Sequence, residues 1–209
     1  MIQDTLSAKI IANKKVGGLT IVAICGAADL GKSYLSKKII ESLATQNLKA
    51  NHLTLDSYLI DRKTRNAKGI SGYHIQAYDL NEALHNLTAL KNGQSIDFKP
   101  YLHKEGKKGH DSIKLNPAEI LIFDGLHSMH SSFLPHIDIS IFLYTKEDTL
   151  KQIRTAADLV KRNYTIAFSK KISESEFSSY KINIEPYKNK ADHLLFLESK
   201  WNYDLINNY

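Results

Sequence analysis

The segment Gly26–Ser33 constrains the fold of this chain more than any other part of the sequence. It reads Gly-Ala-Ala-Asp-Leu-Gly-Lys-Ser and matches the pattern G-x-x-x-x-G-K-[ST] in full. A short apolar, β-branched run precedes it at 19–25, and residues 32–45 after it have apolar positions at helical spacing. A strand, a glycine-containing turn and a helix in this order predict a loop that binds phosphate through backbone N–H groups and the helix N-terminus.

The rest of the chain alternates between short apolar runs and helical patterns. We expect helices at 1–15, 32–45, 80–91 and 147–161, and buried strands at 19–25, 52–55, 120–123, 137–143 and 194–197. Such an alternation predicts a parallel sheet with helices on both faces. Two further segments, 95–102 and 112–115, are expected to be extended and to form a hairpin or flap.

Three polar features each follow a predicted strand: the phosphate-binding loop, Asp56 and Asp124. Ligands of such sheets bind beyond the carboxyl ends of the strands, so we expect the three to meet at one edge. Asp56 is the candidate base that takes a proton from an acceptor hydroxyl, the alternative being a helix-cap or turn aspartate. Asp124 is the candidate second anchor of a magnesium site, the alternative being a turn-forming Asp-Gly pair.

Within the loop, Lys32 is expected to reach the β- and γ-phosphates of ATP, and the Ser33 hydroxyl to bind Mg²⁺ together with Asp124. Asp29 is unusual there, because a carboxylate beside phosphate is unfavourable. We therefore expect the Asp29 side chain to face solvent. The residues expected to bind ATP are Gly26, Ala27, Ala28, Asp29, Leu30, Gly31, Lys32, Ser33 and Tyr34.

Composition narrows the class of protein. The 209 residues are 43% hydrophobic and 24% charged, which is ordinary for a globular chain. No apolar run approaches the roughly 20 residues of a membrane span, and the N-terminus lacks a signal-peptide pattern. A lone cysteine, Cys25, favours a cytoplasmic setting and a buried position for that thiol.

The net charge of +6 leaves several partners open. The basic clusters at 61–65 and 104–108 are expected in loops, where an anionic small substrate, nucleic acid or plain solvation would each explain them. The hypothesis that the chain binds nucleic acid rests on net charge alone, because no block of five or six like charges occurs in the sequence. The sequence also leaves open whether the chain forms a homo-oligomer.

Beyond the loop, the chain resembles the phosphoribulokinase/uridine kinase family of P-loop kinases over residues 19–197. The similarity lies in several short stretches in the family's order. They are Gly26–Ser33, Asp56–Tyr58 with Asp61–Arg62, His74–Asp79, Lys99–Gly106, Pro117–Glu119, Asp124–Met129 and Lys190–Asp192.

This resemblance implies an α/β fold, a P-loop NTPase three-layer sandwich, in one domain spanning 1–209. It also implies a small β-hairpin flap at about 95–116 and a helical lid at about 158–185, names that we keep for these segments. The implied activity is transfer of the γ-phosphoryl of ATP to a sugar or nucleoside hydroxyl, with Mg²⁺. The implied roles are catalysis by Asp56, Lys32 and Arg162, metal binding by Ser33 and Asp124, and acceptor binding by Tyr58, Arg62, Tyr101, His103 and Arg154.

Two departures from the family bear on the acceptor. Uridine kinases carry an aspartate where this chain has Tyr73, and both branches carry an arginine where it has Ala157. A kinase for a uridine- or cytidine-like nucleoside is the leading hypothesis. A sugar-phosphate kinase, supported by Asp61–Arg62 and Gly125–His127, is the alternative within the family. A nucleotide-binding module that has lost its kinase substrate is the alternative outside it.

Overall fold

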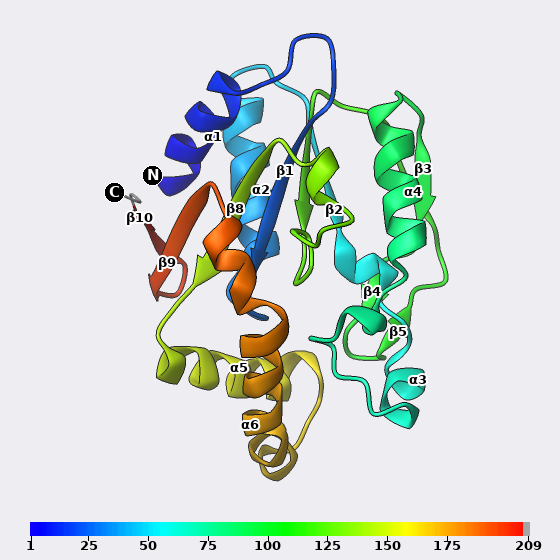
Figure 1. The fold of residues 1–209 in the computed structure, drawn as a ribbon, viewed down its shortest axis with the longest axis vertical. Coiled ribbons are helices and arrows are strands. Elements are labelled where there is room, and N and C mark those ends of the chain that lie inside the picture. The colour runs from blue at the N-terminus through cyan, green and yellow to red at the C-terminus, as the bar shows by residue number, and fades with distance from the viewer. Residues whose placement is uncertain (207–209) are drawn as a thin grey trace.

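A six-stranded sheet forms the centre of the computed structural model, which describes residues 1–206 (Figure 1). The strand order is β10-β9-β8-β1-β7-β2. The bounds are β1 Thr20–Gly26, β2 Ala50–Thr54, β7 Ile120–Asp124, β8 Ile139–Tyr144, β9 His193–Ser199 and β10 Asn202–Ile206. All pairs are parallel except β9 with β10. The predicted parallel sheet is therefore confirmed, and the antiparallel edge strand β10 was not predicted.

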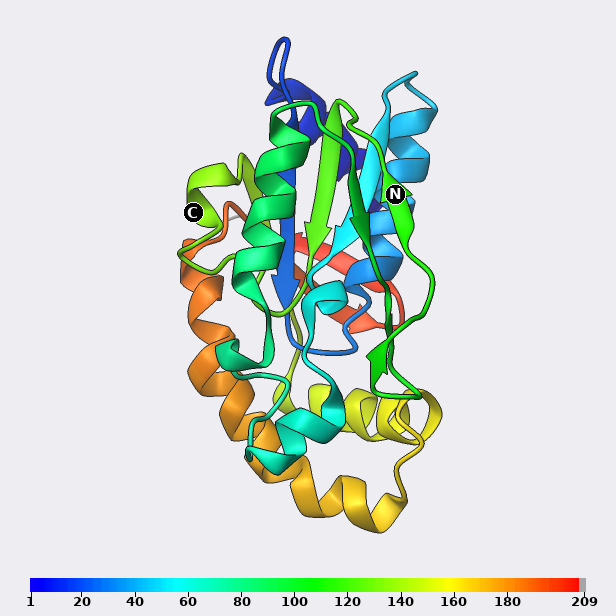
Figure 2. The same ribbon diagram turned by 90° about the vertical axis from the view of Figure 1, so that its right-hand side faces the viewer.

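Helices cover both faces of this sheet (Figure 2). The longer ones are α1 Ile2–Ala12, α2 Lys32–Ala44, α4 Leu80–Lys91, α5 Glu147–Lys161 and α6 Ile166–Asn183. Helices α1 and α2 lie on one face, where Leu6 and Ile39 are buried, and α4 lies on the other, where Leu87 packs in a cluster with Phe123 of β7. The helices predicted at 80–91 and 147–161 from apolar spacing have the same bounds as α4 and α5 in the structure.

The flap contains two short antiparallel ladders. Strand β3 (Ile96–Phe98) pairs with β6 (Ile113–Leu115), and β4 (Tyr101–Leu102) pairs with β5 (Lys107–Lys108). This confirms the extended segments expected there. The basic cluster at 61–65 was expected in a loop, which is wrong, because α3 (Arg62–Ala67) begins inside it.

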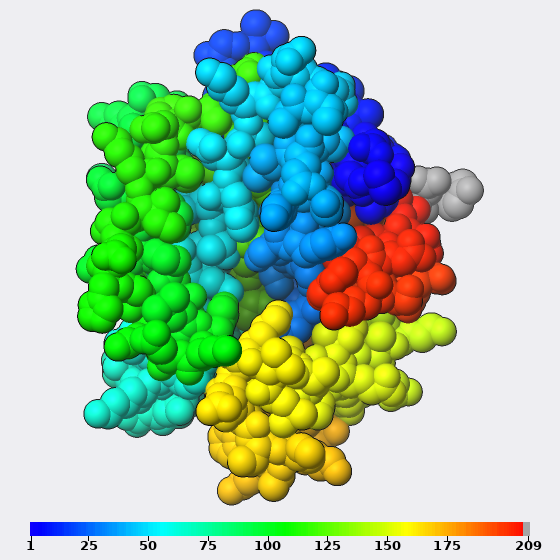
Figure 3. Space-filling view, turned by 180° about the vertical axis from the view of Figure 1, so that it is seen from behind, coloured from blue at the N-terminus to red at the C-terminus, as the bar shows by residue number. Residues whose placement is uncertain are grey.

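The lid continues from the last turn of α5 into α6. Asn163, in the left-handed region at φ 57°, lies in the turn between the two helices, and the Thr165 hydroxyl caps α6 by accepting from the Phe168 backbone N–H at 3.2 Å. In the space-filling view, the lid (yellow) lies below α2, between the flap (green) and the β9–β10 hairpin (red) (Figure 3). Among residues 1–206, no helix has the length and apolar character of a membrane span.

Candidate active site

The phosphate-binding loop connects the end of β1 to the start of α2. Gly26 has φ 137°, and a Cβ there would collide with the Leu143 carbonyl of β8, so the tight turn requires glycine. Ala27 and Leu30, both expected to bind ATP, are fully buried and do not line the cavity beside the loop. Lys32 folds back over the loop, and its Nζ donates to the carbonyls of Gly26 and Ala27 at 3.2 and 2.9 Å.

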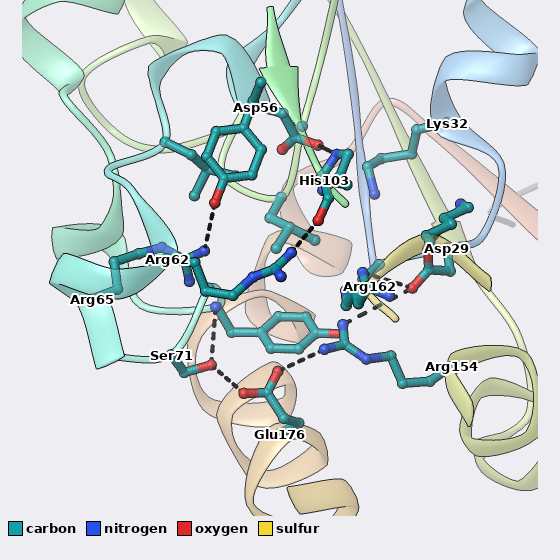
Figure 4. Close-up of a pocket in the computed structure, with 18 of the residues that line it drawn as sticks. Asp29, Lys32, Asp56, Arg62, Arg65, Ser71, His103, Arg154, Arg162 and Glu176 are labelled. Atoms are coloured by element: carbon teal, nitrogen blue, oxygen red, sulfur yellow. Dashed lines mark hydrogen bonds and ion pairs between the residues drawn. The ribbon is translucent and has the colours of Figure 1, made fainter. Parts of the chain in front are cut away.

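A cavity of about 450 Å³ opens beside this loop (Figure 4). Its walls come from the loop, the ends of β2 and β7, α3, the flap and the lid. The expected site residues that line it are Ala28, Asp29, Gly31, Lys32, Ser33, Tyr34, Asp56, Arg62, Tyr101, His103, Asp124, Arg154 and Arg162. The predicted meeting of polar groups at one sheet edge is thus confirmed.

Tyr58 does not belong to this cavity, which corrects the expectation that it contacts substrate. Its side chain is 1% exposed and packs in the same cluster as Leu87 of α4, and the Asn86 amide donates to its hydroxyl at 3.0 Å. The cause is the 3₁₀ turn at Leu55–Tyr58, which carries Asp56 to the cavity and Tyr58 into the core.

Asp124 lies at the base of the cavity and is 1% exposed. Its Oδ2 contacts His52 Nε2 at 3.1 Å and accepts from the Ser36 hydroxyl at 3.2 Å. Burial pushes the pKa of Asp124 upward, but hydrogen bonds from His52, Thr54 and Ser33 outweigh burial and hold the pKa below its ordinary value. Asp124 is therefore an ionised carboxylate next to Ser33.

This pair suits magnesium as a ligand set. An ionised carboxylate and a hydroxyl are oxygen donors, and Mg²⁺ in kinases is commonly held by one or two carboxylates together with substrate phosphates. Within residues 1–206, no cluster of three or more His, Cys, Asp or Glu side chains could hold a metal by itself. The sequence did not indicate His52 or Ser36, because their role depends on which strand and helix adjoin β7.

The flap brings His103 to the candidate base Asp56. His103 Nε2 lies 3.2 Å from Asp56 Oδ2, and the Tyr101 and His103 rings meet edge to face at 5.3 Å. Arg62 of α3 donates to the His103 carbonyl oxygen. Arg65, from the same helix, donates to the Tyr101 hydroxyl at 3.2 Å. Side chains of α3 thus hold the flap over Asp56.

Asp158 organises the junction between α5 and α6. It is 1% exposed and lies 3.1 Å from Arg154 Nε and 3.2 Å from Arg162 Nη1, and it accepts from the Ser169 hydroxyl at 2.8 Å. Arg154 also pairs with Glu176 of α6 at 3.1 Å. These contacts fix both arginines where they line the cavity.

Asp29 contradicts the expectation that it faces solvent. Its side chain is 5% exposed and lies 2.9 Å from Lys161 Nζ, 3.0 Å from Arg162 Nη2 and 4.0 Å from Arg154 Nη1. Burial alone would raise the pKa of Asp29, but the three cations outweigh it and hold the pKa below its ordinary value. The expectation is wrong because the lid supplies cations that make an inward, ionised Asp29 favourable.

Two aromatic rings lie at the other end of the loop. Trp201, in the turn between β9 and β10, stacks on Tyr34 with ring centroids 5.5 Å apart and an interplanar angle of 25°. Both rings line the cavity, and the Tyr203 hydroxyl donates to the Leu30 carbonyl at 2.8 Å. Trp201 was missed because nothing in the sequence indicated that the chain returns to the loop in β10.

His127 follows Asp124 in sequence, but it does not line the cavity. It is 1% exposed, its Nε2–H donates to the Tyr73 carbonyl at 2.9 Å, and its Nδ1 accepts from the Tyr187 hydroxyl at 3.0 Å. Burial lowers its pKa from 6.5 to about 4. His127 is therefore an uncharged, buried side chain that stabilises the segment carrying Tyr73.

This pKa predicts a loss of stability in acid. The unfolded chain takes up a proton below pH 6.5 and the folded chain only near pH 4, so the stabilising contribution of neutral His127 is present above pH 6.5 and falls between these values. We expect protonation of His127 to lower the free energy of unfolding by about 2 kcal/mol between pH 7 and pH 5. Urea unfolding of the wild type and His127→Gln at both pH values measures this. Equal pH-dependent losses in the two proteins would rule out His127 as the cause.

Comparisons with known proteins bear on the family and the fold of the chain. The model of the family described as "Phosphoribulokinase / Uridine kinase family" matches residues 21–198. A uridine kinase of Shewanella piezotolerans is 27% identical over 180 residues, covering 82% of this chain and 84% of the relative. A phosphoribulokinase of Synechocystis is 24% identical over 179 residues, covering 83% of this chain and 52% of the relative.

A solved structure shares the fold at lower identity. D-glycerate 3-kinase from Cryptococcus neoformans superposes with a TM-score of 0.72 at 10% identity, covering 100% of this chain and 99% of that one. Such an identity shows a common fold and no more. The expected α/β fold of P-loop kinases is confirmed.

Proposed function

Because the chain belongs to the phosphoribulokinase/uridine kinase family, we propose that it transfers the γ-phosphoryl group of ATP to a hydroxyl of a small molecule. One observation carries this proposal: a carboxylate, the P-loop lysine and an arginine of the lid segment line the same cavity. They are Asp56, Lys32 and Arg162, and each supplies a different requirement of phosphoryl transfer.

Each residue has a distinct part in the proposed reaction. The backbone of the loop and Lys32 hold the phosphates. Asp56 accepts the proton of the acceptor hydroxyl as that oxygen attacks the γ-phosphorus, the bond from the γ-phosphorus to the bridging oxygen breaks, and ADP leaves. Arg162 lies where it can stabilise charge on the transferred group. Asp124 and Ser33 would hold Mg²⁺, which neutralises phosphate charge when bound. His103 positions the Asp56 carboxylate through its 3.2 Å contact.

A nucleoside is the acceptor that we propose first. The cavity wall between α3, the flap and the lid carries the rings of Tyr101, Tyr164 and Phe168, which suit a base and a ribose. A sugar phosphate is the second candidate, because Arg62 and Arg65 line the same wall and a guanidinium binds phosphate well.

An acceptor panel separates the two classes. Uridine, cytidine and several pentose phosphates are each supplied with ATP and Mg²⁺, and ADP formation is measured, with Lys32→Ala as the inactive control. A nucleoside kinase should turn over nucleosides and leave the pentose phosphates unphosphorylated. A sugar-phosphate kinase should turn over pentose phosphates and leave the nucleosides unphosphorylated.

Trp201 gives a direct readout of the nucleotide site, because it is the single tryptophan of the chain. We propose that the adenine base lies against the Tyr34–Trp201 pair, so ATP should quench or shift Trp201 emission. Inorganic tripolyphosphate has no base, and it should compete with ATP while leaving the emission nearly unchanged. Equal emission changes with both ligands would contradict a base site at Trp201.

A further inference from the structure

The lid segment and the phosphate-binding loop are joined by a group of ion pairs that all involve one carboxylate. The cations are Arg154 of α5 together with Lys161 and Arg162 of the lid segment, and the carboxylate is Asp29. We call these three residues the lid cations. Figure 4 shows Arg154 and Arg162 turned toward Asp29 at the cavity wall. Asp29 stands three positions before Lys32, so its carboxylate belongs to the same loop that is proposed to hold the phosphates.

The other carboxylates near the lid cations do not provide this link. Asp158 pairs with Arg154 and Arg162, and Glu176 pairs with Arg154. Asp158 lies on α5 with the cations and Glu176 lies on the adjoining α6, so neither acid belongs to the loop. Within residues 1–206, every ion pair between the lid cations and the loop ends on Asp29. Three cations therefore face three carboxylates, and only Asp29 couples the charge of the lid to the loop.

We propose that Asp29 is a positioning residue that takes the place of a nucleotide phosphate. Its carboxylate holds the lid cations over the loop before ATP binds, and it releases them to the phosphates when ATP arrives. The release of the cations to ATP rests on the proposed function, whereas the holding of the cations before ATP binds does not. Because a polyphosphate carries more negative charge than one carboxylate, it outcompetes Asp29 for the same cations.

Two consequences follow from this competition. Without nucleotide, loss of the Asp29 charge should release the lid, because no other carboxylate of the loop can hold the cations. With nucleotide, the same loss should strengthen ATP binding, because the phosphates no longer displace a competitor and no longer lie beside a carboxylate. A residue with a merely structural role would weaken both the lid and the binding of ATP.

Asp29→Asn is the appropriate variant. Asp29 has φ 66°, and asparagine is among the residues that tolerate this left-handed backbone, so the substitution removes charge with little strain. Glu174→Gln is the matched control, because it removes an exposed ion pair between α5 and α6, Lys151–Glu174 at 3.0 Å, without touching the loop. Asp29→Glu, which keeps the charge, tests for rescue.

Hydrogen exchange over residues 154–176 is measured first in the nucleotide-free proteins. We expect at least tenfold faster exchange in Asp29→Asn than in the wild type and Glu174→Gln, partial recovery in Asp29→Glu, and wild-type protection in Asp29→Asn once ATP is added. Equal exchange in wild type and Asp29→Asn would overturn the proposal.

ATP binding is then followed by Trp201 emission, and the KM values are measured with the acceptor. The Kd and KM for ATP should fall severalfold in Asp29→Asn, with the acceptor KM unchanged. Weaker ATP binding in Asp29→Asn would also overturn the proposal. If the wild type failed to bind ATP at all, the proposed function would fall, while the nucleotide-free exchange would still test the link between Asp29 and the lid.

Discussion

Replacing Asp56 with asparagine should lower turnover by about 10²–10⁴-fold while ATP affinity stays within about twofold. Asparagine keeps the shape and the hydrogen-bonding reach of the side chain, but it cannot take a proton from the acceptor hydroxyl. The Asp56 carboxylate lies at the cavity with His103 3.2 Å away, and it is separate from the loop that holds the phosphates. Binding and transfer should therefore separate in this variant.

Initial rates of ADP formation and ATP titrations followed by Trp201 emission give the two quantities. Asp97→Asn is the control, because Asp97 is an exposed carboxylate of the flap that does not line the cavity. Wild-type turnover in Asp56→Asn would remove Asp56 from the mechanism. Loss of ATP binding in Asp56→Asn would instead place this carboxylate in the nucleotide site.

Replacing Arg162 with alanine should lower turnover by about 10³-fold, in the range of arginines that stabilise charge on a transferred phosphoryl group. Arg162 lines the cavity from the lid, within 3.0 Å of the loop carboxylate Asp29. The family arginine expected at position 157 is replaced by alanine, so we propose that Arg162 carries more of this task. Arg162→Lys should recover part of the rate, since it restores charge without the planar fork.

Lys170→Ala removes an exposed cation of the same lid and serves as the control. Thermal unfolding of each variant shows whether the lid substitutions disturb the fold. We expect little change in Arg162→Ala, because Asp158 keeps Arg154 and Ser169 as partners when Arg162 is lost. Turnover of Arg162→Ala within about threefold of the wild type, at unchanged stability, would exclude this role.

The parts of the fold that sequence predicts well are those fixed by local patterns. The run before Gly26 is apolar and β-branched, and the structure buries all of β1. Helix α4 has its predicted bounds because Asp79 caps its start and Asn92–Gly93 follow its end. Strand β10 was missed because its polar residues alternate at an exposed edge, and α6 received no predicted bounds because few of its residues are buried.

The candidate site also contains some residues that sequence patterns predict and others that they do not. Lys32, Asp56 and Asp124 meet because parallel strands end at one edge, which topology alone predicts. The direction of Asp29 depends on Lys161, which lies 132 residues further along the chain. His52 and Trp201 likewise reach the site through a neighbouring strand and a hairpin. No local pattern encodes contacts of this kind, so only the structure could supply them.

Transfer of labelled phosphate tests the central claim most directly. ATP labelled at the γ-phosphate is incubated with the wild type, Lys32→Ala or Asp56→Asn and the best acceptor of the panel, and the label on the acceptor is counted. We predict acceptor-dependent transfer by the wild type, none by Lys32→Ala, and ATP binding without transfer by Asp56→Asn. Binding of ATP by the wild type, seen in Trp201 emission, with no label on any nucleoside or pentose phosphate would contradict the account and favour a nucleotide-binding protein without kinase activity.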